Sequence, residues 1–370
     1  MTTWIIGDLL TGRRIQTLPV KSGSWSDVLN DSGSISCTVT LRDPDVARLG
    51  LRESAKPGKA FLAAIDGDIV LQAGPIVSHS WSSPSDLTLT GAGMWSYFDR
   101  VMVIPDLPVG VLPTDPTANT SFTSSLQGAA RGLVAQHLGR VDGDVPVIVP
   151  AAVAGSMVRD YSGADLTPLG QRLRELTQVE GGPDIRFQPR LTVDRLGIEW
   201  VMLIGTPSQP LLFSAVEPVF TVGVPGSPVS GFSVKADGSR VAGRVYASGG
   251  RSSDEALIAI GSNGDLSAQG FPLLERVDSS RATITLLSTL QGFADELAMR
   301  ADSTVETWQF THRTEERPFL AGYSVGDFAK VRIVEDLYTP PGEYRLRILS
   351  RSGDAEGRVV SVKFQPEVSV

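Results

Sequence analysis

Polar and apolar residues alternate without a break over residues 34–41, which is the clearest strand pattern in the chain. Successive side chains of a β-strand point to opposite faces, so a period of two indicates a strand with one buried face. The apolar face here holds Ile35, Cys37, Val39 and Leu41, and the other face holds serines and threonines. The same alternation returns through much of the chain, which indicates a protein built mainly from half-buried strands.

Residues 1–104 are predicted to form one β-rich unit around this strand. A polar turn at residues 25–33 leads into it, and Asp66-Gly67 is typical of a hairpin turn. Turn residues separate the further strands, as in a sheet of short strands. These strands are expected at residues 59–65, 69–80 and 87–91.

Residues 105–121 break this pattern. They carry four prolines among Asp, Thr, Asn and Ser, a composition that buries too little apolar surface to order itself. We therefore interpret the segment as a Pro-rich loop or linker.

A smaller α+β middle domain is predicted over residues 122–210. Its first helix has apolar residues at helical spacing over residues 126–138 and ends at Gly139, a common C-terminal cap. A second helix begins at residues 167–168, a Thr-Pro pair, and ends at residues 181–183. Two strands are expected after it, at residues 184–187 and 197–204.

Residues 211–370 are predicted to form a second β-rich domain with one helix at about residues 285–300. The apolar face of that helix is expected to hold Leu286, Leu290, Phe293 and Leu297. Near the end of the chain, alternating strands at residues 344–348 and 360–364 are predicted to meet across a turn at residues 352–354.

The two β-rich ends of the chain share a spacing of strand segments. An alternating strand, at residues 34–41 or 305–310, precedes three further segments in each half. These lie near Gly58, Ile76 and Leu87 in the first half and near Gly326, Ile348 and Val359 in the second. We therefore predict a β-rich α+β fold in which two related β-barrel-like tube domains flank the middle domain.

The length of 370 residues allows two or three domains of about 150 residues each. The 38 glycines and 24 prolines fit the many turns that short strands need. Lysine and arginine total 33 against 41 Asp and Glu, so the net charge of −8 has the wrong sign for nucleic-acid binding. We expect no sequence-specific nucleic acid as a partner.

The single cysteine, Cys37, can form neither an intrachain disulfide nor a thiolate metal cluster, so we expect folding in a cytoplasm. The N-terminus lacks the basic segment and apolar core of a signal peptide, and no run approaches the roughly 18 apolar residues of a membrane span. We expect neither ordinary secretion nor stable membrane insertion.

No group of residues has the pattern of a catalytic or metal site. His79, His137 and His312 share no metal-ligand spacing; we expect His137 to be half-buried and hydrogen-bonded on its helix, and the other two to lie at the surface. Cys37 lies on an apolar strand face, where burial disfavours a reactive thiolate.

Paired carboxylates and clustered glycines are also interpreted as structural. The pairs Asp43/Asp45, Asp254/Glu255 and Glu315/Glu316 are expected to be solvated loop charges. The glycines at residues 249–251 and 261–264 lack the features of a phosphate-binding loop and are interpreted as hairpin turns. We therefore predict no catalytic residue, no metal ligand and no cofactor, and no enzymatic activity.

Three segments of the sequence resemble segments of a known protein family. The run WSDVLNDSGSIS at residues 25–36, EGGPDIRF at residues 180–187 and GYSVGDF at residues 322–328 resemble minor tail proteins of long-tailed phages of actinobacteria. Members of that family resemble the baseplate hub protein of contractile-tailed phages and the N-terminal part of tail-associated lysins. Many relatives carry C-terminal hydrolase or fibre domains; this chain ends at Val370 after the last predicted strand, so we expect no lytic activity.

The resemblance implies a structural virion protein at the tail tip, made and assembled in the cytoplasm of the host bacterium. It implies a homotrimeric hub ring that joins a sixfold tail tube or distal tail ring to threefold tip components, around a channel for tape-measure protein and DNA. Six barrels in a trimer would provide the quasi-equivalent surfaces for that match. Further expected partners are other minor tail or fibre proteins, and the net charge suggests an acidic channel wall that repels DNA.

Two alternatives remain open at this point. One is a hexameric distal tail protein, which would normally have one tube-like barrel and an appended domain. The other is a cell-wall-binding or cell-wall-hydrolysing tip protein. A groove that gathers several of Trp4, Trp25, Trp81, Trp95, Trp200 and Trp308 would favour the second, and buried, scattered tryptophans would oppose it.

Overall fold

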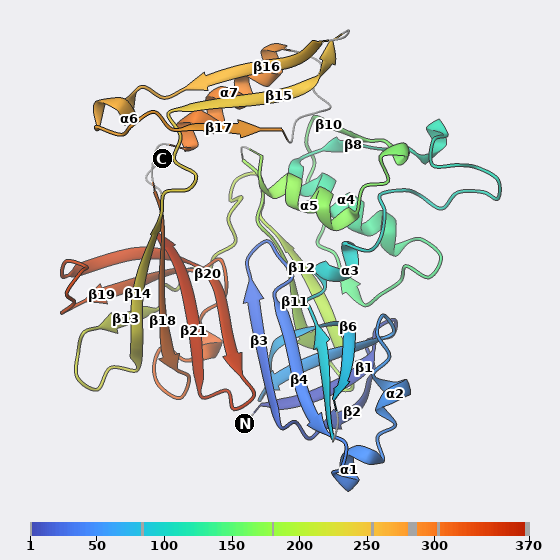
Figure 1. Cartoon of the computed structure of the whole chain (residues 1–370). Coiled ribbons are helices and arrows are strands. Elements are labelled where there is room, and N and C mark those ends of the chain that lie inside the picture. The colour runs from blue at the N-terminus through green and yellow to red at the C-terminus, as the bar shows by residue number, and fades with distance from the viewer. Residues whose placement is uncertain are drawn as a thin grey trace. The chain divides into compact units, whose positions relative to one another are not determined.

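The computed structural model in Figure 1 describes residues 2–82, 85–179, 181–252, 255–279, 287–301 and 304–366. Strands make up 43% of the chain and helices 17%, which confirms the predicted β-rich α+β class. The chain forms two compact units: unit 1 holds Met1–Phe232 and Gln309–Val370, and unit 2 holds Ser233–Trp308. The predicted domain boundaries after residues 104, 121 and 210 stay predictions.

The first half of unit 1 supplies strands β1 to β7 of a large, mainly antiparallel sheet. In β4, buried and partly exposed side chains alternate, so the half-buried strand predicted at residues 34–41 is confirmed. The strands predicted after it are confirmed as β5, β6 and β7. The bounds are β1 Thr3–Asp8, β2 Arg14–Leu18, β3 Ser22–Val28, β4 Ser34–Thr40, β5 Ala60–Asp66, β6 Ile69–Ser82 and β7 Asp86–Gly91.

The end of the chain supplies the rest of that sheet. Its strands are β13 Val219–Val222, β14 Val229–Asp237, β18 Val305–Arg313, β19 Phe328–Ile333, β20 Gly342–Asp354 and β21 Val359–Pro366. A short turn, η3 Leu320–Gly322, lies between β18 and β19. The strand patterns predicted at residues 305–310, 344–348 and 360–364 are confirmed.

The two groups of strands repeat one order. Hydrogen-bonded neighbours run β3-β4-β7-β6-β5 in the first group and β14-β18-β21-β20-β19 in the second. The long strand of each group also shifts register at the equivalent place, between Ile76 and Ser78 in β6 and between Ile348 and Ser350 in β20. These are the segments whose spacing predicted two related halves, and we name the two groups the first and second repeat.

The long strand β20 joins the repeats into one sheet. Its first part pairs with β19, and its last part pairs with β3, where Ser352 lies opposite Ser26. Among the described strands the path stays open from β14 at one end to β2 at the other, so no barrel closes. The repeats are thus barrel-like portions of a continuous sheet.

The middle of the chain packs on the first repeat through one apolar core. Helix α4 has the predicted bounds, and the Ser125 hydroxyl caps it by accepting from the Gly128 N–H at 3.0 Å. The bounds are α3 Trp95–Phe98, η1 Pro116–Ala118, β8 Thr120–Ser124, α4 Leu126–Leu138, β9 Val147–Ile148, β10 Met157–Tyr161, η2 Gly163–Asp165, α5 Leu169–Thr177, β11 Ile185–Leu191 and β12 Ile198–Ile204. The predicted linker, residues 105–121, contains η1 and the start of β8.

In the described part of unit 2, helix α7 packs on a three-stranded sheet, and the short helix α6 follows β16. Its elements are β15 Arg244–Ser252, β16 Glu255–Ser262, α6 Asp265–Ala268, β17 Glu275–Asp278 and α7 Leu287–Arg300. Ala259 of β16 packs with Leu290 and Ala294 of α7, which confirms the predicted helix; Leu286 lies outside the described residues. A Cβ on Gly261 would lie 1.9 Å from the Ala294 carbonyl oxygen, so glycine lets the helix approach the sheet.

Two predicted turns and one predicted helix end are misplaced. Residues 25–28, assigned to a polar turn, belong to β3, because Trp25 and Asp27 both point into the core there. Residues 352–354 continue β20 in pairing with β3, so the turn follows at residues 355–358. Helix α5 ends at Thr177, before the glycines that were expected to end it.

Candidate functional site

The three histidines lie apart, on β6, α4 and β18. His79 is exposed, as predicted, and His137 is buried in α4, where its Nε2 shares a hydrogen bond of 2.9 Å with the Tyr97 hydroxyl. The surface position predicted for His312 is wrong, because β18 extends to Arg313 and its alternation carries His312 inward beside Phe220.

His137 should make stability depend on pH. Burial and, to a lesser degree, Arg140 lower its pKa to about 4, against about 6.5 in an unfolded chain. The unfolded chain therefore binds more protons between these values, so the free energy of unfolding should fall as the pH drops through this window. The limiting slope is about 1.4 kcal/mol per pH unit. We expect His137→Gln to flatten the slope measured by urea unfolding from about pH 7 to about pH 4.5.

His312 provides the internal reference for that measurement. Burial also lowers the pKa of His312, so the variant should keep a smaller slope in the same direction. Equal slopes in wild type and His137→Gln would contradict the assignment.

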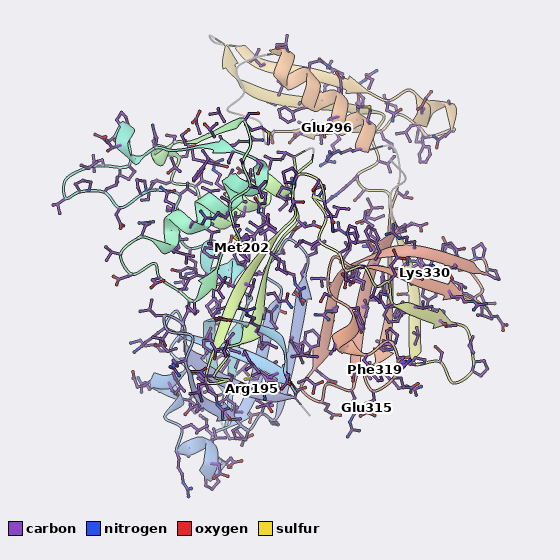
Figure 2. All side chains as sticks on the ribbon, turned by 180° about the vertical axis from the view of Figure 1, so that it is seen from behind. Arg195, Met202, Glu296, Glu315, Phe319 and Lys330 are labelled. Carbon is purple, nitrogen blue, oxygen red and sulfur yellow. The ribbon has the colours of Figure 1, made fainter. Side chains whose placement is uncertain are left out.

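The other candidate groups are Cys37 and the paired carboxylates. Cys37 is buried, and burial raises the pKa of its thiol to about 12, as its apolar position predicted. Asp43 caps α1 by accepting from the Asp45 N–H at 2.9 Å, and Glu315 is exposed at the lower end of the second repeat in Figure 2. Asp43, Asp45, Glu315 and Glu316 are exposed, as expected, but the loop position is wrong for Asp45, which lies in α1, and for Glu255, which begins β16; Asp254 lies outside the described residues.

Neither glycine cluster is a hairpin turn, so that interpretation is wrong. Residues 249–251 lie within β15 at a register shift, and residues 261–262 end β16 shortly before α6. Within the described part of the chain, no group of three or more His, Cys, Asp or Glu side chains could hold a metal ion. No helix there is long and apolar enough to span a membrane.

The tryptophans do not line a common groove. Trp4, Trp25, Trp95, Trp200 and Trp308 are buried, and Trp81 is 65% exposed. This is the arrangement that opposes a sugar-binding groove, since sugar recognition would use several exposed rings together.

One face of the large sheet is covered with hydroxyl groups. Cross-strand pairs place serines and threonines opposite one another from β14 to β6, and neighbouring hydroxyls bond across strands at 2.9 Å for Ser26 and Ser34 and 3.0 Å for Thr38 and Thr88. We name this surface the hydroxyl face; it includes Ser24, Ser26, Ser34, Ser36, Thr38, Ser78, Ser80, Thr88, Thr90, Ser230, Thr311, Ser352 and Ser361.

The hydroxyl face carries charged residues of both signs. Asp86 and Asp354 are acidic, and Lys363 and Arg313 are basic; Arg347, opposite Gln365 of β21, lies at its edge and pairs with Asp184. The carboxylate of Asp86 also accepts from Lys21 at 2.8 Å, and this hydrogen bond keeps the pKa of Asp86 below its usual range. The alternation predicted this wet face on β4; its extent across the sheet depends on long-range pairing.

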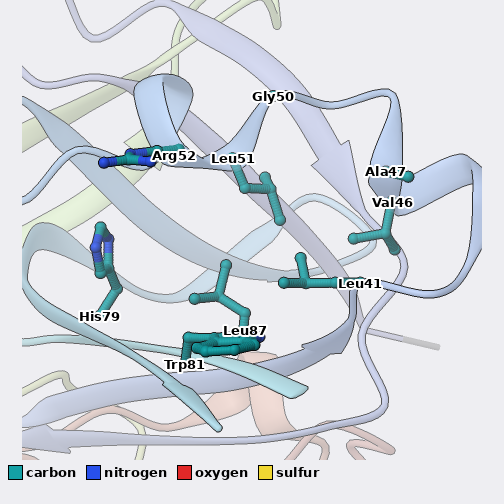
Figure 3. A pocket seen from close by; sticks show the side chains of 9 residues that line it. All are labelled: Leu41, Val46, Ala47, Gly50, Leu51, Arg52, His79, Trp81 and Leu87. Carbon is teal, nitrogen blue, oxygen red and sulfur yellow. The ribbon is translucent and has the colours of Figure 1, made fainter. Parts of the chain in front are cut away.

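A pocket of about 620 Å³ opens between the end of β6, β7 and two short helices, α1 Pro44–Ala47 and α2 Leu51–Ser54 (Figure 3). Val46, Leu51 and Leu87 are buried and form its apolar lining. Trp81 forms an exposed wall beside Leu87, and Arg52 and His79 lie together at one end. Sequence reasoning missed this pocket, because its parts meet only in the folded chain.

Comparison with known proteins places the fold. No protein-family model matches the chain, and no curated protein matches it in sequence. The 43 kDa tail protein of prophage MuSo2 from Shewanella oneidensis matches with a TM-score of 0.58 and 13% identity over 98% of both chains. The tail protein from Neisseria meningitidis MC58 matches with a TM-score of 0.54 and 14% identity, over 98% of this chain and 97% of that one. The chain has the fold of these tail proteins.

A more distant match lies in a larger assembly. The PdpA-VgrG complex of Francisella matches with a TM-score of 0.51 and 6% identity, over 99% of this chain and 52% of that one. The named tail proteins agree with the resemblance of the sequence to phage tail proteins; the resemblance to actinobacterial members in particular stays a prediction.

Proposed function

We propose that this chain is a structural, non-enzymatic protein of a phage tail tip. The observation that carries the proposal is the fold similarity to the prophage MuSo2 tail protein, which extends over 98% of both chains. Three copies would form a hub ring between a sixfold tail tube or distal tail ring and threefold tip components. Its partners would be those proteins, other minor tail or fibre proteins and the tape-measure protein, after assembly in the host cytoplasm.

The internal repeat supports a trimer over a hexamer. Each chain carries two sets of strands in the same order, joined side by side through β3 and β20. Three chains therefore supply six similar sets, and a ring of six similar sets can meet a sixfold partner. A hexamer would place twelve sets at the same joint.

The hydroxyl face has the chemistry of a channel wall. Phosphate contacts by Lys and Arg supply most non-specific DNA affinity, and this face carries few cations. Its hydroxyls bond to one another across strands, so fewer groups are available to bind a passing chain. Under this proposal, DNA adheres weakly to the channel wall because the wall carries few cations, and not because the wall is acidic, as the net charge suggested.

The mass and symmetry of the purified assembly test the proposal. We expect native mass spectrometry of the full chain to give three times the chain mass of 39.4 kDa. Electron cryomicroscopy of the ring should show threefold symmetry, with the hydroxyl face toward the central channel. Sixfold symmetry would favour the distal tail protein, and a persistent monomer that cleaves peptidoglycan would contradict the proposal outright.

A further inference from the structure

The loop of residues 334–340, which joins β19 to β20, presents two large side chains to solvent. Leu337 is 108% exposed and Tyr338 is 77% exposed. Exposed Glu335 and Asp336 precede them, so the loop combines an apolar tip with two negative charges. Aromatic side chains that bury on binding are frequent anchors of protein interfaces.

This loop is held in place before any partner binds. The Asp336 carboxylate accepts from the backbone N–H groups of Tyr338 at 3.0 Å and Thr339 at 2.7 Å. The Val334 N–H donates to the Val222 carbonyl at 3.0 Å, which ties the loop to the end of β13. A preorganised loop loses little conformational entropy on binding.

The pocket beside Trp81 has the complementary chemistry. Its volume lies within the range of about 300–1,000 Å³ typical of ligand pockets, which is enough space for two neighbouring side chains. Its lining is apolar, and Arg52 at one end matches the acidic residues of the loop. Exposed Arg48 adds a second positive charge close by; its contact with Asp45 is long, at 3.8 Å.

The loop and the pocket lie on opposite sides of unit 1. In Figure 1 the turn between β19 and β20 is at the far left, and α1 and α2 are at the lower right. In the sheet, β3 and β4 separate β20 from β7 and β6. The loop therefore does not reach the pocket of its own copy.

The internal repeat indicates how two copies meet. Within one chain, the last part of β20 pairs with β3; the equivalent strands of the other repeats are β6 and β14. Residues 76–82 of β6 have β7 as their partner among the described strands, and β14 ends the strand order. Repeating the internal step therefore brings β14 of one copy beside this part of β6, which carries Trp81, in the next.

We propose that residues 334–340 of one copy bind in the pocket beside Trp81 of the next copy. Leu337 and Tyr338 then cover the apolar lining, and Glu335 lies near Arg52. The contact is head-to-tail, and its repetition generates a ring of three when the rotation between copies is one third of a full turn. It rests on the proposed hub ring and supplies the joint between its copies.

A single substitution at the loop tip tests this joint. Leu337→Asp in the full chain is expected to raise the dissociation constant of the ring at least about 30-fold, because it would place an unpaired charge in the apolar pocket. Native mass spectrometry across a dilution series measures the change. Leu112→Asp is the matched control, because Leu112 is 66% exposed in a different loop, and it should assemble as wild type does.

Two further variants test direction and charge. In a mixture of Leu337→Asp and Trp81→Asp chains, the intact loop of the Trp81→Asp chain can still bind the intact pocket of the Leu337→Asp chain. The reverse contact is lost on both sides, so a head-to-tail contact predicts a heterodimer and no closed ring. Arg52→Glu should weaken the ring, and adding Glu335→Arg should restore part of the loss. A rescue of this kind would not follow from a general loss of stability.

A cross-linking experiment distinguishes a failure of the proposed joint from a failure of the proposed hub ring. The variant with Trp81→Cys and Leu337→Cys, oxidised with glutathione disulfide, should give covalent dimers and trimers; buried Cys37 does not compete. A wild-type ring that persists in Leu337→Asp and forms no cross-link overturns the joint and leaves the hub proposal standing. A monomeric wild type that cross-links supports the joint and counts against a stable purified ring, and a monomer that does not cross-link overturns both.

Discussion

Replacing Asp27 by alanine should destabilise unit 1 by about 3–5 kcal/mol, the cost of leaving buried charges without their partner. The Asp27 Oδ2 accepts from Arg186 Nη2 at 2.6 Å and from Arg351 Nη2 at 3.1 Å. The three side chains are 12%, 9% and 6% exposed, so solvent does not replace the lost carboxylate. Urea unfolding of the full chain measures the difference.

The position of Asp27 explains the size of this effect. Asp27 lies on β3, Arg186 on β11 and Arg351 on β20, so one carboxylate joins the first repeat, the middle elements and the second repeat. Burial lowers the pKa of Arg186, and the Asp27 carboxylate opposes that shift. Arg351 also donates to the Tyr323 carbonyl at 2.5 Å, which holds it in place when the carboxylate is removed.

Two variants control for volume and for surface charge. Asp27→Asn keeps the shape of the side chain and removes its charge, so it should lose most of the same stability. Asp86→Ala removes the solvated partner of Lys21 and should leave the unfolding curve unchanged. If Asp27→Ala unfolds at the wild-type urea concentration, the buried Asp27 carboxylate and its two arginines do not hold the repeats together.

The same aspartate shows where local sequence reasoning fails. Alternation identified β4 because Ile35, Cys37 and Val39 are apolar residues at inward positions. In β3 the inward residues are Trp25 and a charged Asp27, so the pattern resembles a polar turn. The partners of Asp27 are 159 and 324 residues away, and no local pattern indicates such a pairing.

The internal repeat could be predicted from the sequence, whereas the positions of individual turns could not. Segment spacing aligned Ile76 with Ile348, and the structure places a register shift beside each of them. Spacing survives because equivalent strands have similar lengths, although their residues differ. The turn after β20 was placed too early, because Ser352 and Gly353 have turn composition but pair with β3.

The residues of the proposed joint could not be predicted from sequence patterns, for a different reason. Trp81 is on a strand half whose inward side faces short helices rather than a sheet, and those helices span four residues each. Leu337 and Tyr338 belong to no alternating or helical pattern of apolar residues. The sequence therefore does not indicate whether this loop tip is exposed or buried in the folded chain. Its exposure is known only from the fold.

Replacing Trp200 by alanine should cost about 3–5 kcal/mol of unfolding free energy, typical of a large aromatic side chain removed from a core. Trp200 of β12 is fully buried, and its Nε1 donates to the Ala73 carbonyl of β6 at 3.0 Å. Its ring meets Phe61 of β5 edge-on, with ring centres 5.5 Å apart. The substitution therefore opens a cavity between the middle elements and the first repeat and leaves a buried carbonyl without its donor.

Trp81→Ala is the matched control for Trp200→Ala and separates stability from assembly. Trp81 is exposed, so its removal should change the unfolding free energy by no more than about 0.5 kcal/mol while weakening the ring through the proposed joint. Thermal unfolding at low protein concentration reports the first effect, and native mass spectrometry of the same samples reports the second. Trp200→Ala should lower the unfolding temperature even where the protein is monomeric, because its contacts lie within one copy. If both variants lose ring and stability together, the joint is not independent of the core, and the assignment of Trp81 to an interface between copies is wrong.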